Sequence, residues 1–537
     1  MTRCLRFVRW WLAMCLVLAG SAASAAGSGH LVSVQWLQQN LSQPGLLLLD
    51  ASPGPLHAKA HIAGAVHADL MTFGTHEQAP SAMQQRARNW GVSPGRKIVI
   101  YDGDGTMWAA RIFFELVQLG YPADDITLLD GGLAKWISVG GAVTQAPTAA
   151  PAPGSFTARA PRDQLLARLP EVLVATGEPQ RVTVVDALTP EYHFGARQYF
   201  DRGGHLPNAR LLPHSDFFNE DKTFKSPAQL RQMLDHQGLT PDRAAITYCG
   251  GGVAAAVPFF AMKYLLGHRD VKLYPGSQLE WLRDERSLPM WTYDAPYLLR
   301  DIDWLKTWGQ GFMRQMGMAR VQILDLRPAA AYAQGHLAGA VHIAAEALRA
   351  AANDRAALTA LLQPLAAGAA AGYETVVVSD LGGIQRDSAL ALWLLEQTLG
   401  APVSILTASV DDWALRGLPL VKTAATAAAS SPIAAVVPAR RVPAERKLRA
   451  ADAVTLASGA TPPPNAAQGR WIHLPAATLL AREGQPKPAG ELWAALHKAG
   501  VPRHTELVLS ADDIGDAAVN YVLLRMMGWS ALHVQGP

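Results

Sequence analysis

Cys249 and the glycines after it are the residues of this 537-residue chain whose types and spacing best suit chemistry. The cysteine stands where a short apolar stretch, residues 245–248, ends, and Gly250, Gly251 and Gly252 follow it directly. Three glycines permit a tight turn in which successive N–H groups point inward, and an apolar helix after the turn adds the positive end of its dipole. Such a turn stabilises a thiolate or a bound anion, so the stretch predicts a nucleophilic cysteine. The alternative is a glycine-rich turn around a small buried cysteine.

The first residues of the chain predict a targeting segment. A basic part with Arg3, Arg6 and Arg9 precedes an apolar run at residues 10–19, and small residues suited to cleavage follow. The apolar run is shorter than a membrane-spanning helix needs. We therefore expect residues 1–26 to be a cleaved signal peptide, with export to the bacterial periplasm and no stable membrane span afterwards.

Cleavage would change the charge and the cysteine content of the chain. The formal net charge is +3, and the segment holds three basic and no acidic residues, so the mature chain would be neutral. A neutral chain gives no reason to expect nucleic acid or an anionic membrane surface as a partner. Cys4 and Cys15 would leave with the segment, so Cys249 would be the single cysteine and no internal disulfide could form. A lone thiol in an exported protein is a candidate reactive group.

The elements that must position Cys249 recur along the chain as four similar units. Each of the first three has an apolar strand ending in aspartate, a histidine motif, a second strand, a helix and a late tryptophan, whereas the fourth is weaker. Short apolar strands alternating with helices predict an α/β fold of repeated domains, each a mainly parallel sheet flanked by helices. The predicted domains span residues 31–145, 160–290, 297–421 and 444–537.

The position of Cys249 holds other residues in the other units. Its equivalents are Asp102, Asp380 and, approximately, Ala511. Ligands of parallel sheets bind beyond the carboxyl ends of the strands, which is where Cys249 lies. We therefore expect the domain at 160–290 to be catalytic and the other three to be non-catalytic.

Histidines and aspartates also recur at fixed places in the units. The histidines occur in units without the cysteine, so we expect them to hold a loop by hydrogen bonds. The aspartates end strands, where a carboxylate is more often a turn or cap residue than a catalyst. The histidines are His61, His205 and His336, and the aspartates are Asp50, Asp186 and Asp325.

Four stretches match the motifs of a known family. They are Asp130-Gly131-Gly132-Leu133 with Trp136, residues 203–209 (GGHLPNA), residues 249–254 (CGGGVA), and residues 273–277 (LYPGS) with Glu280-Trp281. On these residues the chain resembles the rhodanese superfamily of sulfurtransferases. Its first two units look like a tandem thiosulfate or 3-mercaptopyruvate sulfurtransferase, which implies the rhodanese fold.

The resemblance and the chemistry of the loop imply sulfur transfer through Cys249. Its thiolate would attack the outer sulfur of a small donor and become a persulfide, which a thiophilic acceptor such as cyanide, a thiol or a protein thiol would then discharge. Backbone amides aimed at the sulfur would stabilise both anions, and the reaction needs no metal or other cofactor. The five amides belong to Gly250, Gly251, Gly252, Val253 and Ala254.

The chain departs from the family pattern at several positions. Glu191 stands where mercaptopyruvate enzymes carry a substrate arginine, which leaves Arg197 and Arg202 as candidate anion binders or as solvated surface residues. Pro275 replaces the usual aspartate, and Ser277 is retained. The matching serine of mercaptopyruvate enzymes is implicated in a hydrogen-bonding relay. These departures bear on the choice of donor more than on the type of reaction.

Three other functions compete with a sulfurtransferase. A cysteine phosphatase needs an arginine six residues after the cysteine, where this chain has Ala255, so that reading is disfavoured. A sulfur-relay protein would carry sulfur on Cys249 without turning over a small donor. A docking protein would use the three units that lack the cysteine for assembly.

Overall fold

The structure, a computed structural model, describes most of the chain. The described residues are 29–70, 77–103, 107–310, 320–422, 453–459, 470–481 and 484–535, and the predicted signal peptide lies outside them. They form two compact units. The first holds the described residues up to Leu169 with His214–Leu230 and Pro241–Ser277, and the second holds Pro170–Pro213, Arg231–Thr240 and the residues from Gln278 onward.

The first unit contains a parallel sheet of five strands. Its order is β1 (Leu31–Val32), β5 (Ile126–Leu129), β4 (Lys97–Tyr101), β2 (Leu46–Asp50) and β3 (Val66–His67). β2 and β4 are almost continuous apolar runs and are buried along nearly their whole length. This is the pattern expected of parallel strands that are covered on both faces.

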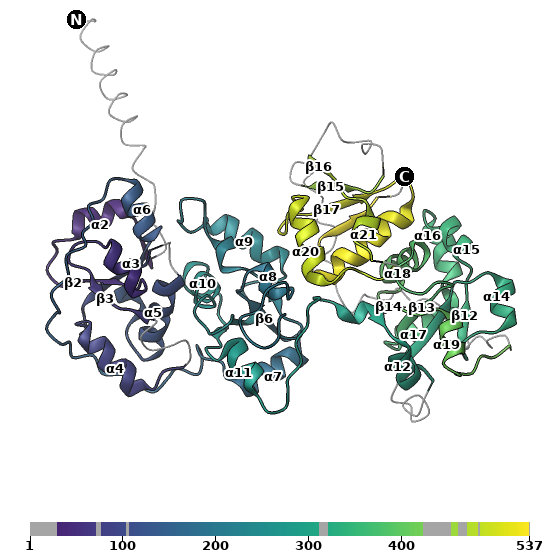
Figure 1. Cartoon of the computed structure of the whole chain (residues 1–537), viewed down its shortest axis with the longest axis horizontal. Coiled ribbons are helices and arrows are strands. Elements are labelled where there is room, and N and C mark those ends of the chain that lie inside the picture. The colour runs from purple at the N-terminus through teal and green to yellow at the C-terminus, as the bar shows by residue number, and fades with distance from the viewer. Residues whose placement is uncertain are drawn as a thin grey trace, which may run out of the picture. The chain divides into compact units, whose positions relative to one another are not determined.

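Helices accompany this sheet (Figure 1). They are α2 (Val34–Asn40), α3 (Gly54–Lys59), α4 (Pro80–Asn89), α5 (Met107–Gln118) and α6 (Gly132–Ser138). Every residue of α5 from Ala109 onward is buried, so this helix has no solvent-exposed face over that length. A helix that is buried all round must pack against neighbours on more than one side.

The segment around Cys249 belongs to the same unit. β8 (Ala244–Tyr248) pairs in parallel with β9 (Val271–Leu273), and α10 (Ala256–Phe260) lies between them in sequence. α10 packs against α5, and the ring centroids of Phe114 and Phe259 lie 5.1 Å apart at this contact (Figure 1). α5 therefore supports the helix that leaves the Cys249 loop.

The helix after the loop is less regular than the sequence predicts. The sequence predicts one apolar helix after the turn, but α10 ends at Phe260 and Ala261–Leu265 is a π-helical turn. Pro258 lies in the first turn of α10, where its missing N–H removes no hydrogen bond within the helix.

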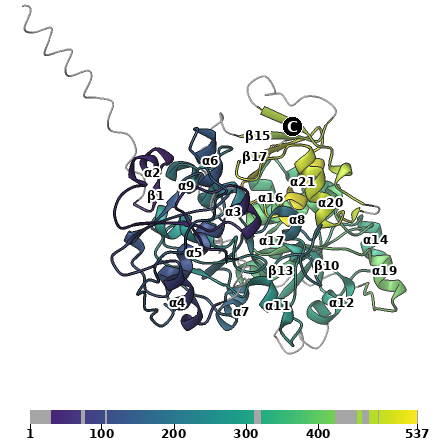
Figure 2. The ribbon, with the colours of Figure 1, turned by 60° about the vertical axis from the view of Figure 1, so that its left-hand side comes forward.

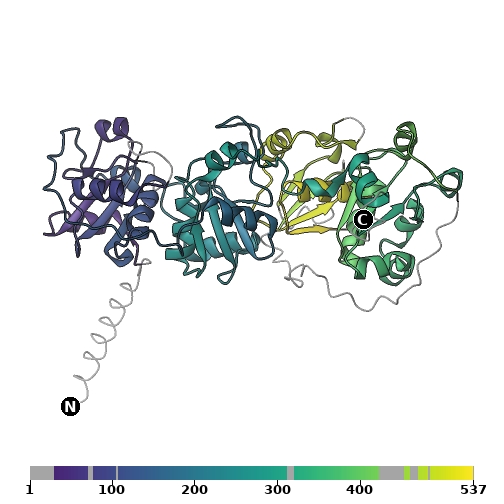
Figure 3. The same ribbon diagram turned by 90° about the horizontal axis from the view of Figure 1, so that it is seen from below.

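The described part of the second unit contains two further parallel sheets. One has the order β10 (Leu299–Arg300), β14 (Val403–Leu406), β13 (Glu374–Val378), β11 (Val321–Asp325) and β12 (Ala340–His342). The other has the order β16 (Arg470–His473), β15 (Val454–Ala457), β17 (Leu507–Ser510) and β18 (Leu532–Val534), and Figure 3 shows it with helices beside it. β6 (Val182–Asp186) and β7 (Arg210–Leu211) also pair in parallel.

Two long helices pack together in the second unit. α18 (Arg386–Leu399) lies against α21 (Ile514–Met526), and α21 also lies beside β17 (Figures 1 and 2). Glu396 at this contact accepts a hydrogen bond from the Tyr521 hydroxyl at 2.8 Å and pairs with Arg525 at 2.6 Å. The two helices share one buried apolar core, so they join their sheets into one body.

The remaining helices complete the chain. They are α7 (Leu169–Gly177), α8 (Pro190–His193), α9 (Pro227–His236), α11 (Ser277–Arg283), α12 (Ile302–Leu305), α14 (Ala329–Gln334), α15 (Ala345–Ala351), α16 (Arg355–Leu361), α17 (Gln363–Ala370), α19 (Val410–Leu415) and α20 (Ala489–Lys498). Parallel sheets flanked by helices confirm the predicted fold class. Within the described ranges, no helix combines the length and the apolar character that crossing a membrane requires.

The recurring histidines hold loops, as predicted. The Nδ1–H of each buried ring donates to a backbone carbonyl that precedes its motif in the chain. The bonds join His61 to His57 at 2.9 Å, His205 to His193 at 2.8 Å, and His336 to Tyr332 at 2.9 Å.

The recurring aspartates occupy turns. Each buried carboxylate accepts a hydrogen bond from the backbone N–H two residues later, which fixes the turn that follows the strand. The distances are 2.9 Å at Asp50, 2.9 Å at Asp186 and 3.0 Å at Asp325.

Candidate active site

Cys249 follows the last residue of β8 and is 3% exposed. It is a free cysteine, and no other cysteine lies in the described ranges. Its N–H donates to Ser277 Oγ at 3.1 Å, and its Sγ accepts a hydrogen bond from the Gly252 N–H at 3.1 Å. The buried sulfur therefore already faces an amide donor, which is the environment that stabilises a negative charge on sulfur.

Gly252 has a backbone conformation that only glycine suits. Its φ is +85°, in the left-handed region. A Cβ at this position would lie 2.6 Å from Arg111 Nη1 and 2.7 Å from the Pro275 carbonyl oxygen. The tight turn predicted from the three glycines is thus needed at Gly252, both for the backbone angle and for space.

The other residues of the predicted loop have mixed exposure. Gly250 and Ala254 are buried, whereas Gly251 and Val253 are partly exposed. The structure gives the sulfur a bond from Gly252, and the convergence of the other four amides stays a prediction.

Arg111 on α5 holds the loop from behind and is a residue that the sequence interpretation missed. Its Nη1 donates to the Gly252 carbonyl at 2.9 Å, while its Nε and Nη2 donate to Glu115 Oε1 at 2.9 and 2.6 Å. Glu115 Oε2 in turn accepts from Gln118 Nε2 at 2.9 Å. A signal for this network was present, because Arg111 and Glu115 are the charged residues, four positions apart, of an otherwise mostly apolar helix.

Ser277 lies at the base of the loop. It is fully buried, and its Oγ accepts from the Cys249 N–H and donates to the Tyr274 carbonyl at 2.9 Å. Its φ is +50°, an uncommon conformation for a residue other than glycine. The serine therefore contacts the backbone of the cysteine and anchors the start of the loop.

The two candidate anion binders lie in the second compact unit, whereas Cys249 lies in the first. Arg197 is exposed and its N–H donates to the Glu191 carbonyl at 2.8 Å, and Arg202 is partly buried. Their role at the loop stays a prediction. The structure thus brings together Cys249, Gly252 and Ser277 of the predicted site.

The residues equivalent to Cys249 have other roles. Asp102 is buried, and its Oδ2 accepts from the N–H groups of Trp108 and Ala109 at 3.0 and 3.1 Å, so it caps the first turn of α5. Asp380 follows β13 and is exposed. Ala511 follows β17, and its methyl side chain has no reactive group.

His193, His205 and Asp294 form the one cluster in the described ranges that brings three potential metal ligands together. The two imidazole rings stack at 3.7 Å with an interplanar angle of 3°. A metal ion must lie near the plane of each coordinating ring at about 2.0–2.1 Å from nitrogen, which two parallel stacked rings do not allow for one ion. The cluster is better suited to sharing protons than to holding a metal.

Protonation of this cluster is set by its carboxylates. His193 Nδ1 lies 2.8 Å from Asp186 Oδ2, and its Nε2 lies 2.6 Å from Asp294 Oδ1. Burial alone would lower the pKa of His193, but attraction and hydrogen bonds from Asp294 and Asp186 outweigh burial and hold the pKa above its ordinary value. Burial and the neighbouring His193 lower the pKa of His205 to about 4.

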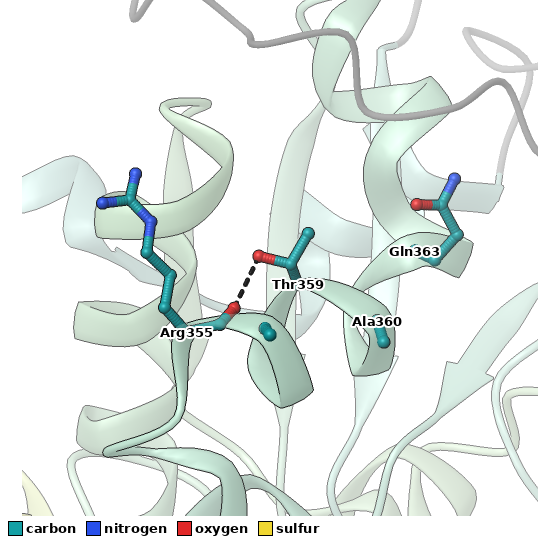
Figure 4. A pocket seen from close by; sticks show the side chains of 5 residues that line it. Arg355, Thr359, Ala360 and Gln363 are labelled. Carbon is teal, nitrogen blue, oxygen red and sulfur yellow. Dashed lines mark hydrogen bonds between the residues drawn. The ribbon is translucent and has the colours of Figure 1, made fainter.

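A separate open pocket lies along α16 (Figure 4). Its lining residues are Arg355, Ala356, Thr359, Ala360 and Gln363. The Thr359 hydroxyl donates to the Arg355 carbonyl at 2.7 Å, so it is used within the helix. These side chains offer no nucleophile, and the pocket is not a candidate for catalysis.

A family model described as a rhodanese-like domain matches residues 33–138, 170–284 and 310–416. These three segments make up more than half of the chain, and the second includes Cys249.

Curated relatives cover about half of the chain and nearly all of their own length. A sulfur carrier protein, TtuD of Thermus thermophilus, is 29% identical over 276 residues, which are 47% of this chain and 93% of the relative. A probable 3-mercaptopyruvate sulfurtransferase of Pseudomonas aeruginosa is 31% identical over 280 residues, 48% of this chain and 97% of the relative. A putative thiosulfate sulfurtransferase of Mycolicibacterium smegmatis is 29% identical over 274 residues, which are 48% of this chain and 95% of the relative.

Solved structures to which the chain is similar include SseA from Escherichia coli, described among 3-mercaptopyruvate sulfotransferases. It is 26% identical, covers 46% of this chain and 98% of its own, and gives a TM-score of 0.42. An anaerobic ergothioneine biosynthesis enzyme from Chlorobium limicola is 18% identical, covers 49% of this chain and 70% of its own, and gives a TM-score of 0.45.

Proposed function

Because the chain belongs to the rhodanese-like family, we propose that it is a sulfurtransferase that works through a persulfide on Cys249. It moves sulfane sulfur from thiosulfate or 3-mercaptopyruvate to a thiophilic acceptor. The observation that carries this proposal is the hydrogen bond from the Gly252 N–H to the buried Cys249 sulfur. Relatives named as sulfurtransferases support the same reaction class.

The proposed first half-reaction loads the cysteine. The Cys249 thiolate attacks the outer sulfur of the donor, a sulfur–sulfur bond forms, and the bond between that sulfur and the rest of the donor breaks. The leaving group takes the electron pair, so thiosulfate releases sulfite, and mercaptopyruvate releases pyruvate after its carbanion gains a proton. The Gly252 N–H stabilises negative charge on sulfur before and after the step.

The second half-reaction discharges the persulfide. The acceptor attacks the terminal sulfur, the sulfur–sulfur bond breaks, and the electron pair returns to Cys249 as a thiolate. With cyanide as acceptor, the product is thiocyanate. Ser277 keeps the loop in place during both steps through its bonds to Cys249 and Tyr274.

Several predictions from the sequence belong to this proposal. Arg197 and Arg202 bind the anionic donor, and catalysis is confined to the domain at residues 160–290. The signal peptide at residues 1–26 is removed on export to the periplasm. No metal or other cofactor takes part.

A second candidate function is a sulfur carrier with a protein as its partner. The similarity to a relative named as a sulfur carrier protein favours it. In this case Cys249 accepts sulfur from a protein persulfide or passes it to a protein thiol, and it turns over no small donor.

The test is the intact mass of the purified mature protein before and after incubation with thiosulfate or with 3-mercaptopyruvate. The proposal expects a gain of one sulfur atom with at least one donor, loss of that sulfur on adding cyanide, and production of thiocyanate. Cys249→Ser should fold and take up no sulfur, because the side chains are nearly isosteric. A sulfur adduct that persists in Cys249→Ser would contradict the persulfide route, and loading only from a protein donor would favour the carrier.

A further inference from the structure

The six-residue loop from Cys249 to Ala254 contains no basic side chain, yet a buried cation contacts it from α5. We propose that Arg111 is a positioning residue for sulfur transfer, which holds the Gly252 carbonyl and thereby keeps the Gly252 N–H directed at the Cys249 sulfur. This inference rests on the proposed function. In this role Arg111 acts through the backbone of Gly252.

The guanidinium group of Arg111 is fixed on both sides. Nη1 contacts the Gly252 carbonyl at 2.9 Å, and Nε and Nη2 contact one oxygen of Glu115. The other oxygen of Glu115 is held by Gln118. The guanidinium is planar and rigid, so fixing two of its nitrogens on Glu115 determines where Nη1 points.

Burial makes this network a rigid one. Arg111 and Glu115 are each 0% exposed and Gln118 is 1% exposed, so water does not compete for their hydrogen bonds. All three side chains lie on one buried helix, which also packs against α10. A change at Arg111 therefore reaches the loop directly.

The connection from Arg111 to the sulfur runs through one residue. The N–H and C=O of Gly252 are separated by two rotatable backbone bonds, and the N–H donates to Cys249 Sγ while the C=O accepts from Arg111. Glycine rotates freely about these bonds, so its amide needs an external constraint to stay aimed at the sulfur. Arg111 supplies that constraint at the carbonyl end.

The effect of Arg111 is one of geometry more than of net charge. Its carboxylate partner Glu115 lies at 2.6 Å, so the pair is neutral as a whole. A donor anion attracted by net charge would gain little from a neutral pair. Loss of the guanidinium group that bridges Glu115 and Gly252 should therefore lower kcat and leave KM of the donor nearly unchanged.

The test compares Arg111→Lys with Arg88→Lys as a matched control. Lysine keeps the charge but cannot bridge Glu115 and Gly252 as a planar fork. Arg88 also holds a backbone carbonyl at 2.7 Å, but that of Phe156, which is not part of the loop. Two readouts are needed: kcat and KM for thiosulfate and mercaptopyruvate, and the rate of Cys249 alkylation by iodoacetamide as a function of pH.

We expect kcat of Arg111→Lys to fall about tenfold or more with KM changed by less than about twofold. The alkylation profile should move to higher pH, because the thiolate loses a fixed amide donor. Arg88→Lys should match the wild type in both readouts. Gln118→Met, a milder change that frees one oxygen of Glu115, should move both readouts in the same direction by less.

A folded Arg111→Lys with an unchanged kcat and an unchanged alkylation profile would overturn the inference, as would a loss of thermal stability alone. If Arg111→Lys does not fold, Gln118→Met decides by the same criteria. The alkylation profile needs no sulfur donor, so it tests the positioning role even if the wild type turns over neither donor. A wild type that turns over neither donor would count against the proposed function and not against this inference.

Discussion

Gly252 meets three structural requirements at one position of the chain. Its left-handed φ, its lack of a Cβ and its two backbone hydrogen bonds are all required for an amide to reach the Cys249 sulfur. The chemistry of the site therefore depends on a glycine as much as on the cysteine.

Gly252→Ala should abolish sulfur loading and lower thermal stability, because a Cβ there would meet Arg111 and the Pro275 carbonyl at under 3 Å. Gly267→Ala is the control: its φ of +75° imposes a similar backbone strain, but no atom lies within 4 Å of the added Cβ. The control should lose about 1 kcal/mol of stability or somewhat more and keep its activity. Thermal denaturation and intact mass after thiosulfate would measure both effects, and equal losses of activity in the two variants would contradict this account.

At the scale of elements, features formed within one segment of the chain could be predicted from the sequence, whereas contacts between distant segments could not. The strand before Cys249 and the turn after it were visible because a strand, a turn and a helix follow one another within about 20 residues. The same holds for the histidine motifs. Arg111 and Gly252 are 141 residues apart, and no periodicity within one segment reveals which distant carbonyl a buried arginine contacts.

The start of α5 is held by a carboxylate that the sequence predicts to be the equivalent of Cys249. Asp102 stands at the position of Cys249 but caps the helix that carries Arg111. Asp102→Ala should destabilise the protein by about 1–3 kcal/mol, because two N–H groups at the buried end of α5 lose their acceptor. Asp102→Asn retains one acceptor oxygen and should lose less, so an equal loss in denaturant unfolding would contradict the capping role.

At the scale of the whole molecule, the described residues form two compact units that hold different clusters of polar side chains. The first contains Cys249 and its supporting network, and the second contains the stacked pair His193 and His205 with Asp294. The sequence predicted the repeated α/β architecture from its alternating strands and helices. It did not predict the His193 cluster, because Asp294 lies 101 residues after His193.

This cluster makes stability depend on pH. The pKa of His193 is raised in the folded state, so its contribution is complete below about pH 6.5 and is lost as pH rises through the folded-state pKa. His205 stays neutral in this range, because its pKa is about 4. Asp294→Asn removes one of the two carboxylates that raise the folded-state pKa of His193, so the loss should be smaller and complete at a lower pH than in the wild type. Thermal denaturation from pH 6 to 9 would measure the difference, and identical profiles would contradict this assignment.

The full burial of the Arg111–Glu115 pair has a consequence for ionic strength. Dissolved salt screens charges that water can reach, with a screening length of about 8 Å at 0.15 M, and screens buried pairs much less. The geometry around Cys249 should therefore be the same at low and at high ionic strength. Donor capture by exposed Arg197 should instead weaken as salt is added, so KM for an anionic donor should rise with ionic strength while kcat stays constant.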